Sequence, residues 1–264
     1  MVMGILNVTP DSFYANSRME NEEAICRRVG DILLEGGDII DVGAYSSRPG
    51  AADVSEDEEM RRLAKALDII RRHHPEALVS IDTFRASVAR RCVEEFNADI
   101  INDISGGQLD EEMFQTVAAL RVPYILMHML GTPQTMQQAP HYEHLLAEVA
   151  QYFAFRLQRL HEEGVADVIL DPGFGFGKTL EHNYDLLRHL GDLVGLFPDN
   201  AFLVGVSRKS MIYQLLDISP EEALNGTTVL HTIALQAGAR ILRVHDVKAA
   251  VETIRIWQAV QTKM

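Results

Sequence analysis

Short runs of apolar residues, rich in valine, isoleucine and leucine, recur along the chain and constrain its fold more than any other feature. The eight runs span residues 2–8, 38–44, 78–83, 98–104, 124–129, 168–173, 202–207 and 241–246. Between them, as in residues 56–74 and 148–164, apolar residues recur at the three- and four-residue spacing of amphipathic helices. Strand then helix, repeated about eight times, predicts an α/β fold, a parallel (β/α)8 TIM barrel. A doubly wound open sheet is the alternative.

The length and composition agree with one large core. The chain has 264 residues, of which 47% are hydrophobic, and α/β barrels of about this length commonly form a single domain. No linker rich in proline, glycine or serine divides the sequence, and it contains no internal repeat. We therefore expect one domain over residues 1–264.

Charge and cysteine usage exclude several classes of protein. The net charge of −14 repels polyanions, so we expect no nucleic-acid partner, although local basic pockets for small anions are still allowed. Cys26 and Cys92 are too few for a disulfide framework, and we expect two buried, inert thiols in a reducing cytosol. No apolar run approaches the roughly 18 residues of a membrane span. The sequence thus predicts a cytoplasmic protein without a membrane partner.

The glycine-rich stretch DPGFGFGKT, residues 171–179, resembles a phosphate-binding loop only superficially. The Walker pattern needs glycine where this chain has Pro172, and the dinucleotide-binding fingerprint needs glycine where it has Lys178. Both patterns fail, so the stretch has to be interpreted from its context.

Polar residues follow nearly every apolar run, at the barrel end where active sites are built. They are Asn7 and Asp11, the loop 45–51, Asp82, Asn102 and Asp103, His128, Asp171, the segment 207–210, and Arg243, His245 and Asp246. Each has a structural alternative, such as a helix cap, a turn or a half-buried histidine. Their convergence on one end of the barrel predicts a functional site there.

Several sequence blocks that span almost the whole chain resemble the dihydropteroate synthase family. They are MGILNVTPDSF (3–13), SRPGA (47–51), SIDT (80–83), INDI (101–104), MHMLGTPQTMQ (127–137), LDPGFGFGKTLEHN (170–183), VGVSRKSMI (204–212) and ARILRVHDV (239–247). The resemblance implies a barrel enzyme of folate synthesis and a homodimer. The implied reaction joins 6-hydroxymethyl-7,8-dihydropterin pyrophosphate to 4-aminobenzoate and releases pyrophosphate.

For the pterin, the resemblance implies recognition by Asp82, Asn102 and Asp171. A flat pterin displays alternating donors and acceptors, which carboxylates and an amide can match. Lys209 would donate to its acceptor atoms, Met127 would line the pocket and Arg243 would lie over the ring.

For the pyrophosphate, the resemblance implies Asn7, Arg243 and His245, with Mg²⁺ bridging Asn7 and phosphate oxygens. Catalytic roles fall to Asp11, Asp82, Lys209, Arg243 and His245. The 4-aminobenzoate site, which sulfonamides would also occupy, is assigned to Ser47, Arg48, Pro49, Phe176, Lys209 and Ser210. The SRKS helix start would offer backbone donors to the carboxylate.

This chain departs from the family at two loops. Residues 14–18 read YANSR in place of a Ser-Asp-Gly-Gly loop, and Tyr45 and Ser47 stand where glutamate and threonine are common. Two other functions stay open: a pterin-binding methyltransferase and a non-catalytic pterin-binding homologue. An amidohydrolase-like metal barrel is disfavoured because Asn7 stands where a His-x-His pair is expected.

Overall fold

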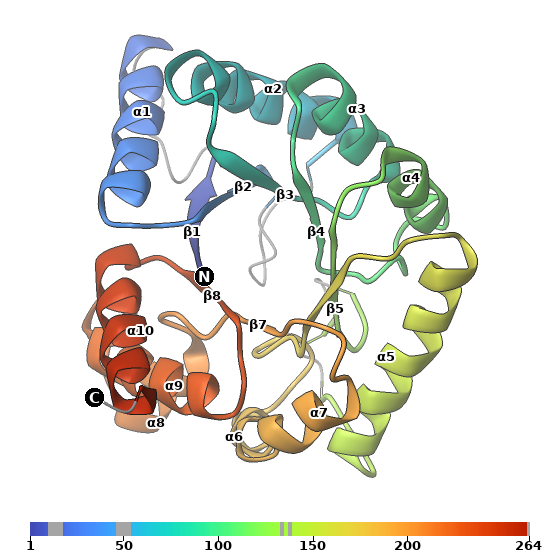
Figure 1. Ribbon diagram of the computed structural model, residues 1–264, viewed down its shortest axis with the longest axis vertical. Coiled ribbons are helices and arrows are strands. Elements are labelled where there is room, and N and C mark those ends of the chain that lie inside the picture. The colour runs from blue at the N-terminus through green and yellow to red at the C-terminus, as the bar shows by residue number, and fades with distance from the viewer. Residues whose placement is uncertain (10–17, 46–53, 133–134, 137–138, 263–264) are drawn as a thin grey trace.

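Parallel strands form a barrel in which each strand pairs with the next along the chain, except that β6 and β7 are the two ends of the sheet (Figure 1). The structure is a computed structural model that describes residues 1–9, 18–45, 54–132, 135–136 and 139–262. Its eight-stranded sheet has the order β6-β5-β4-β3-β2-β1-β8-β7, and a parallel bridge between Leu170 and Phe202 joins the two end strands. The strands are β1 (Val2–Asn7), β2 (Ile39–Gly43), β3 (Leu78–Asp82), β4 (Ile100–Asp103), β5 (Tyr124–Met127), β6 (Val168–Asp171), β7 (Leu203–Val204) and β8 (Ile241–Val244). The predicted TIM barrel is confirmed.

Helices surround this barrel on the outside (Figure 1). They are α1 (Arg18–Leu34), α2 (Glu56–His73), α3 (Ala86–Phe96), α4 (Met113–Leu120), α5 (Leu145–Glu162), α6 (Leu180–Arg188), α7 (Leu190–Leu196), α8 (Ser210–Leu216), the 3-10 helix η1 (Pro220–Glu222), α9 (Leu224–Gln236) and α10 (Val247–Gln261). Helix α2 illustrates the local reasons for these bounds. The Ser55 side chain accepts a hydrogen bond from the backbone of Glu58, and acidic residues in the first turn and basic residues in the last favour the helix dipole.

The structure differs from the sequence prediction in two places. Strand β7 has two residues rather than the six of the run 202–207, because the backbone turns after Val204 and the amide of Lys209 bonds to the carbonyl of Val206. More than one helix follows β6 and β7, whereas the repeat predicted one. Of the two thiols, Cys92 is buried as expected, but Cys26 is only half-buried.

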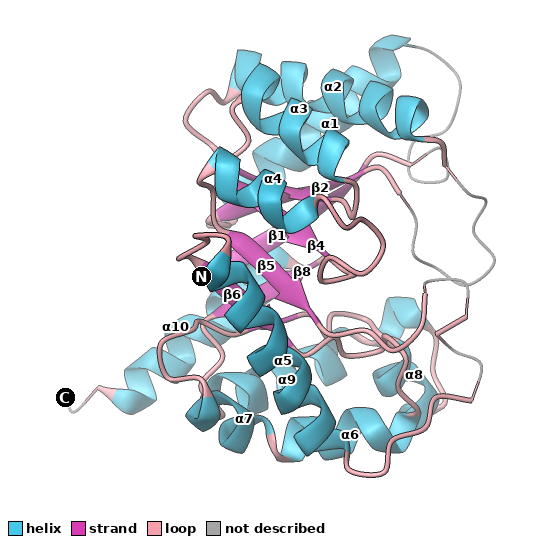
Figure 2. Ribbon diagram, turned by 90° about the vertical axis from the view of Figure 1, so that its right-hand side faces the viewer, coloured by secondary structure: helices cyan, strands magenta, loops and turns pink. Residues whose placement is uncertain are grey.

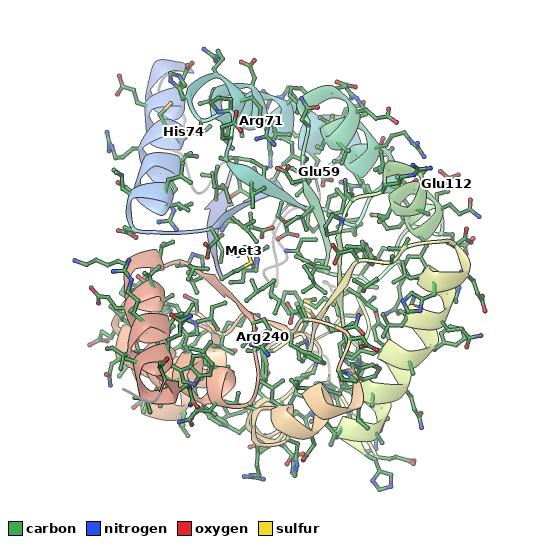
Figure 3. All side chains as sticks on the ribbon, viewed as in Figure 1. Met3, Glu59, Arg71, His74, Glu112 and Arg240 are labelled. Atoms are coloured by element: carbon green, nitrogen blue, oxygen red, sulfur yellow. The ribbon has the colours of Figure 1, made fainter. Side chains whose placement is uncertain are left out.

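An apolar layer fills the amino-terminal half of the barrel interior. Met3, which lies inside the ring of strands in Figure 3, packs with one residue from each of six other strands: Ile39, Ile100, Ile125, Ile169, Leu203 and Ile241. All seven are at most 8% exposed. This layer closes the barrel, since such interiors are packed cores rather than pores.

The two ends of the barrel differ in what they carry. Figure 2 shows both chain termini on the left of the view, beyond the amino ends of the strands. The loops that leave the carboxyl ends of the strands lie toward the right. No helix in the described ranges is long and apolar enough to cross a membrane.

Candidate active site

Strand register aligns several polar residues in one row at the carboxyl end of the barrel. Asn7 is paired with Gly43, Gly43 with Asp82, and Asp82 with Asn102. Neighbouring parallel strands lie about 4.8 Å apart, so these positions stand side by side around the ring. Hydrogen bonding of the sheet thus brings together residues that are up to 95 positions apart in the sequence.

The period of two along a strand places a polar layer directly above the apolar one. Side chains two residues apart point to the same face of a sheet. Counting two residues on from the apolar layer in five strands gives Asp41, Asn102, Met127, Asp171 and Arg243. The barrel interior is therefore closed below by hydrocarbon and lined above by charged and amide groups.

Arg243 connects Asp41 of this layer to Asp82, which ends β3. Its Nε donates to Asp41 Oδ2 and its terminal nitrogen donates to Asp82 Oδ2, each at 2.7 Å. Asn102 Nδ2 lies 3.3 Å from both oxygens of Asp41. Burial lowers the pKa of Arg243, but Asp41 and Asp82 outweigh it, and its pKa stays above the ordinary value. Burial raises the pKa of Asp82 to about 7, although Arg243 opposes this shift.

Asp171, at the end of β6, begins the glycine-rich loop. Its Oδ1 accepts a hydrogen bond from the amide of Gly173 at 2.8 Å. Burial raises its pKa, and Lys209 acts in the opposite direction. The structural alternative of a turn applies to this carboxylate, and the bond to Gly173 uses one of its two oxygens.

The loop itself is a tight turn rather than a phosphate cradle. Gly173, Gly175 and Gly177 all have positive φ, a conformation that favours glycine. The amide of Gly175 donates to Asn183 Oδ1, and the amide of Phe176 donates to the carbonyl of Gly173. Thr179 then caps α6 by accepting a bond from the amide of His182. These loop amides are thus used internally, as the failed phosphate motifs indicated.

Lys209 lies close to this loop and to the charged groups Asp171, Arg243 and Asp82. Its amine donates to the carbonyl of Phe174 and lies 4.7 Å from the centre of the Phe176 ring, a cation–π arrangement. Burial lowers the pKa of Lys209 to about 8, against the opposing effect of Asp171. Ser210 is half-buried and begins α8, next to Lys209.

The other predicted residues in the described ranges lie at the same end of the barrel. Asn7 is half-buried at the end of β1, and Met127 is buried at the end of β5. His245 directly follows β8, and its backbone amide donates a hydrogen bond to Ser207 Oγ at 3.2 Å. Asp11, Ser47, Arg48 and Pro49 fall outside the residues that the structure describes.

Some polar residues that follow the strands have structural roles. Asp103 is buried and accepts hydrogen bonds from Ser105, Gly107 and the Tyr124 hydroxyl, so it stabilises the loop after β4. Arg208 and Asp246 form a two-pronged ion pair at 2.8 and 2.9 Å, which joins the loops after β7 and β8. These contacts give Asp103, Arg208 and Asp246 a part in holding the loops together.

Sequence reasoning missed Asp41 and gave no role to Lys178. Asp41 is fully buried in the middle of β2, whereas the predicted site residues come from the ends of the apolar runs and the loops that follow them. The available signal was a carboxylate within an otherwise apolar strand, since a buried charge is rare unless it is paired. Lys178 is 3% exposed, and nothing in the sequence distinguishes it from a surface lysine.

The site contains oxygen atoms suited to a hard cation held mainly by a ligand. No group of three histidine, cysteine or acidic side chains in the described ranges could hold a metal ion alone. A side-chain carbon added at Gly43 would lie 3.5 Å from Asp82 Oδ2, which accepts a bond from Arg243, and 3.6 Å from Asn7 Oδ1, so both oxygens lie close to the backbone of Gly43. Mg²⁺ typically binds through one or two protein oxygens together with phosphate oxygens, and this arrangement fits that mode.

Comparisons with known proteins give a consistent result. Residues 3–245 match the family described as pterin binding enzyme. The chain is 43% identical to the dihydropteroate synthase of Escherichia coli strain K12, over 98% of this chain and 90% of that protein. Two solved structures are similar throughout. One is a Yersinia pestis dihydropteroate synthase in a sulfonamide drug complex, with a TM-score of 0.91, 39% identity and coverage of 99% of this chain and 94% of that one. The other is a Xanthomonas albilineans dihydropteroate synthase with 4-aminobenzoic acid, with a TM-score of 0.88, 38% identity and coverage of 100% and 93%.

Proposed function

The chain belongs to the dihydropteroate synthase family of pterin-binding enzymes, and from this premise we propose how its residues divide the work of the reaction. It is a transferase of folate biosynthesis. It condenses 6-hydroxymethyl-7,8-dihydropterin pyrophosphate with 4-aminobenzoate to give 7,8-dihydropteroate and pyrophosphate. We further propose that residues 1–264 act as one pterin-binding domain.

The observation that carries the residue assignment is the row of hydrogen-bonding groups above the apolar layer. Asp82, Asn102 and Asp171 would bind the edge of the pterin. Within the described ranges, the hydrogen bonds of these side chains use Asp82 Oδ2, Asn102 Nδ2 and Asp171 Oδ1. One oxygen of each group is thus left for the donors of the ring. Met127 would pack against the ring, and Lys209 would donate to its acceptor atoms.

Arg243, His245 and Asn7 would bind the pyrophosphate at the neighbouring strand ends. Arg243 holds its charge firmly because of Asp41 and Asp82, so it can stabilise the negative charge of a leaving group at any physiological pH. Asn7 Oδ1 would be the protein ligand of Mg²⁺, which supplies additional charge neutralisation when bound. We assign Asp11 a supporting role in this region.

The reaction is proposed to be a dissociative substitution. The bond between the methylene carbon and oxygen breaks first, and its electron pair leaves with the pyrophosphate. The methylene cation is stabilised by the ring electrons and by the nearby carboxylates of Asp82, on β3, and Asp171, on β6. The amine nitrogen of 4-aminobenzoate then bonds to the carbon and releases one proton. An arylamine is already unprotonated near neutral pH, so the reaction needs no strong general base.

The 4-aminobenzoate would lie between Phe176 and the start of α8. Lys209 and Ser210 supply the donors for its carboxylate, and the Phe176 ring supplies a flat apolar surface. Ser47, Arg48 and Pro49 are proposed to complete this site, which is also where sulfonamides would compete.

Exposed apolar side chains support a homodimer. They gather on α8, α9 and α10: Leu215, Leu216, Leu224, Val229, Ile233, Ile256 and Val260, which are 37–77% exposed. Helices α9 and α10 pack against each other, so these side chains can form a continuous surface. Light scattering during gel filtration tests this, and a monomer at micromolar concentration would contradict it. We also propose a cytoplasmic location, which suits the two free thiols.

Pyrophosphate release tests the assignment directly. The purified protein is given the pterin pyrophosphate and Mg²⁺, with and without 4-aminobenzoate, and Lys209→Ala is assayed beside it. Full turnover should require both substrates and should be lost in the variant. Pterin binding without turnover would instead indicate a non-catalytic homologue.

A further inference from the structure

Lys178 is a buried lysine to which the proposed reaction gives no role. It directly precedes Thr179, the residue that caps α6, and it is 3% exposed. Its amine donates to the carbonyl of Gly173 at 3.0 Å and to the carbonyl of Phe176 at 3.1 Å, and it lies 3.0 Å from His128 Nδ1. When it is protonated, the amine has three N–H donors, and these three partners match them.

His128 acts as the acceptor in this arrangement. Burial lowers its pKa well below the ordinary value, and the nearby Lys178 amine lowers it further, so the imidazole stays neutral. The Tyr152 ring packs edge-on against the imidazole, with 4.8 Å between the ring centres. The loop after β5 is therefore tied through Lys178 to the loop after β6.

Lys178 binds the carbonyls of Gly173 and Phe176, and the carbonyl that Lys209 binds, that of Phe174, lies between them in the sequence. Gly173 also donates to Asp171, Phe174 accepts the bond from Lys209, and the Phe176 ring lies beside the Lys209 amine. The same loop carries three glycines with positive φ, whose backbones are the least restricted of any residue. Cross-links to its carbonyls are thus needed to keep the Phe176 ring in one place.

We propose that Lys178 is a positioning residue for 4-aminobenzoate. Lys178 bonds to two carbonyls of residues 173–176 and to His128, and it thereby holds the Phe176 ring beside Lys209. This inference rests on the proposed function, and it adds a residue that the binding of neither substrate requires directly. Burial lowers the pKa of Lys178 to about 7, with Asp171 opposing, so this position disfavours the charged form of the amine.

The two substrates should respond unequally to the loss of this clamp. Phe176 is held by a direct bond from Lys178 and should lose its fixed position. Asp171 is also held by the sheet, where it pairs with Met127 of β5, so the pterin side is fixed independently. A residue needed only for global folding would affect both substrates alike.

The test compares Lys178→Met, which keeps the length of the side chain and removes its donors, with Lys248→Met on the exposed start of α10. We expect Lys178→Met to raise KM for 4-aminobenzoate about tenfold, equal to about 1.4 kcal/mol. KM for the pterin pyrophosphate should change less than about threefold. Amide hydrogen exchange at residues 173–177 should become faster. Lys248→Met should match the unchanged protein in both KM values and in the exchange rate of the loop.

Equal changes in both KM values, or unchanged exchange in the loop, would overturn the proposal. If Lys178→Met does not fold, Lys178→Gln serves, because its amide retains two donors. A smaller loss of the same selectivity would then support the clamp, and no selectivity would refute it. Absence of turnover by the unchanged protein is a failure of the proposed function instead, and the exchange measurement still decides the role of Lys178.

Discussion

Arg243 in β8 reaches past β1 to Asp41 in β2, with 2.7 Å between Nε and Oδ2. The same guanidinium binds Asp82, and Asp41 also lies within hydrogen-bonding distance of the Asn102 amide. Asp41 thus orients Asn102, which we propose binds the pterin, and Arg243, which we propose binds the pyrophosphate, without itself being placed in contact with either.

Asp41→Asn should weaken both folding and pterin binding. Removing one charge of a buried pair lowers the free energy of unfolding by about 3 kcal/mol. This value is at the low end of the usual range because Arg243 still has Asp82 as an ion-pair partner. Pterin affinity should fall about tenfold, since the Asn102 amide loses its anchoring carboxylate. Urea unfolding and calorimetric titration with a pterin measure the two effects.

Asp68→Asn is the matched control for that substitution. Asp68 pairs with Arg72 on the surface, where both side chains are more than half exposed. Its loss should change stability by less than about 1 kcal/mol and leave pterin affinity unchanged. Similar results for the two variants would contradict the role of Asp41.

Activity should fall in alkaline solution as Lys209 loses its proton. Burial lowers its pKa from 10.5 to about 8, so the charged amine is lost above that pH. Between pH 8 and 10.5 the unfolded chain holds more protons at this residue than the folded one, so its contribution to stability rises with pH. Turnover should therefore decline without loss of structure, which parallel rate and circular dichroism measurements detect.

Lys209→Arg provides the comparison for this pH dependence. A guanidinium stays protonated throughout the range, so any residual turnover should lose its alkaline limb near pH 8. A variant profile that still declines at the same pH would assign the limb to another group.

Gly173→Ala should disrupt the loop after β6. Gly173 has φ of 69°, and an added side-chain carbon would lie 1.9 Å from the carbonyl oxygen of His128, which the backbone can relieve only by moving. We expect a loss of about 3 kcal/mol in stability and a large loss of turnover. Thermal unfolding and steady-state kinetics measure these.

Gly164→Ala separates conformational strain from the clash. Gly164 has φ of 90° but no atom within 4 Å of an added carbon. Gly164→Ala should lower the free energy of unfolding by about 1 kcal/mol, from backbone strain alone, and should leave the kinetics unchanged. A loss as large as that of Gly173→Ala would show that close packing against His128 is unimportant.

Positional isotope exchange tests the order of bond breaking. The oxygen that joins the methylene carbon to phosphorus is labelled, and the enzyme is incubated with Mg²⁺ but without 4-aminobenzoate. If the pyrophosphate leaves first and rebinds, the label should move to other oxygens of the same phosphoryl group. Label that stays in place while added 4-aminobenzoate is rapidly converted would argue for direct displacement.

The sequence anticipated the fold because the relevant signal is local and repeated. Apolar runs alternate with amphipathic segments, and the carboxyl ends of parallel strands must meet at one end of a barrel. Asn7, Asp82, Asn102 and Asp171 could therefore be assigned to that end before their register was known. The bounds of β7 and the additional helices were not anticipated, because the departure of the chain from the sheet after Val204 depends on tertiary contacts.

What the sequence by itself determined is thus the barrel, the family and the end of the barrel that carries the polar residues, all of which follow from periodicity and from motif spacing. Only the tertiary structure decided which of those residues bond to one another. Asp41 and Arg243 are 202 positions apart, and Lys178 and His128 are 50 apart. Their pairing depends on side-chain direction and on burial, since a buried charge must find a partner within a few ångströms wherever the chain places one.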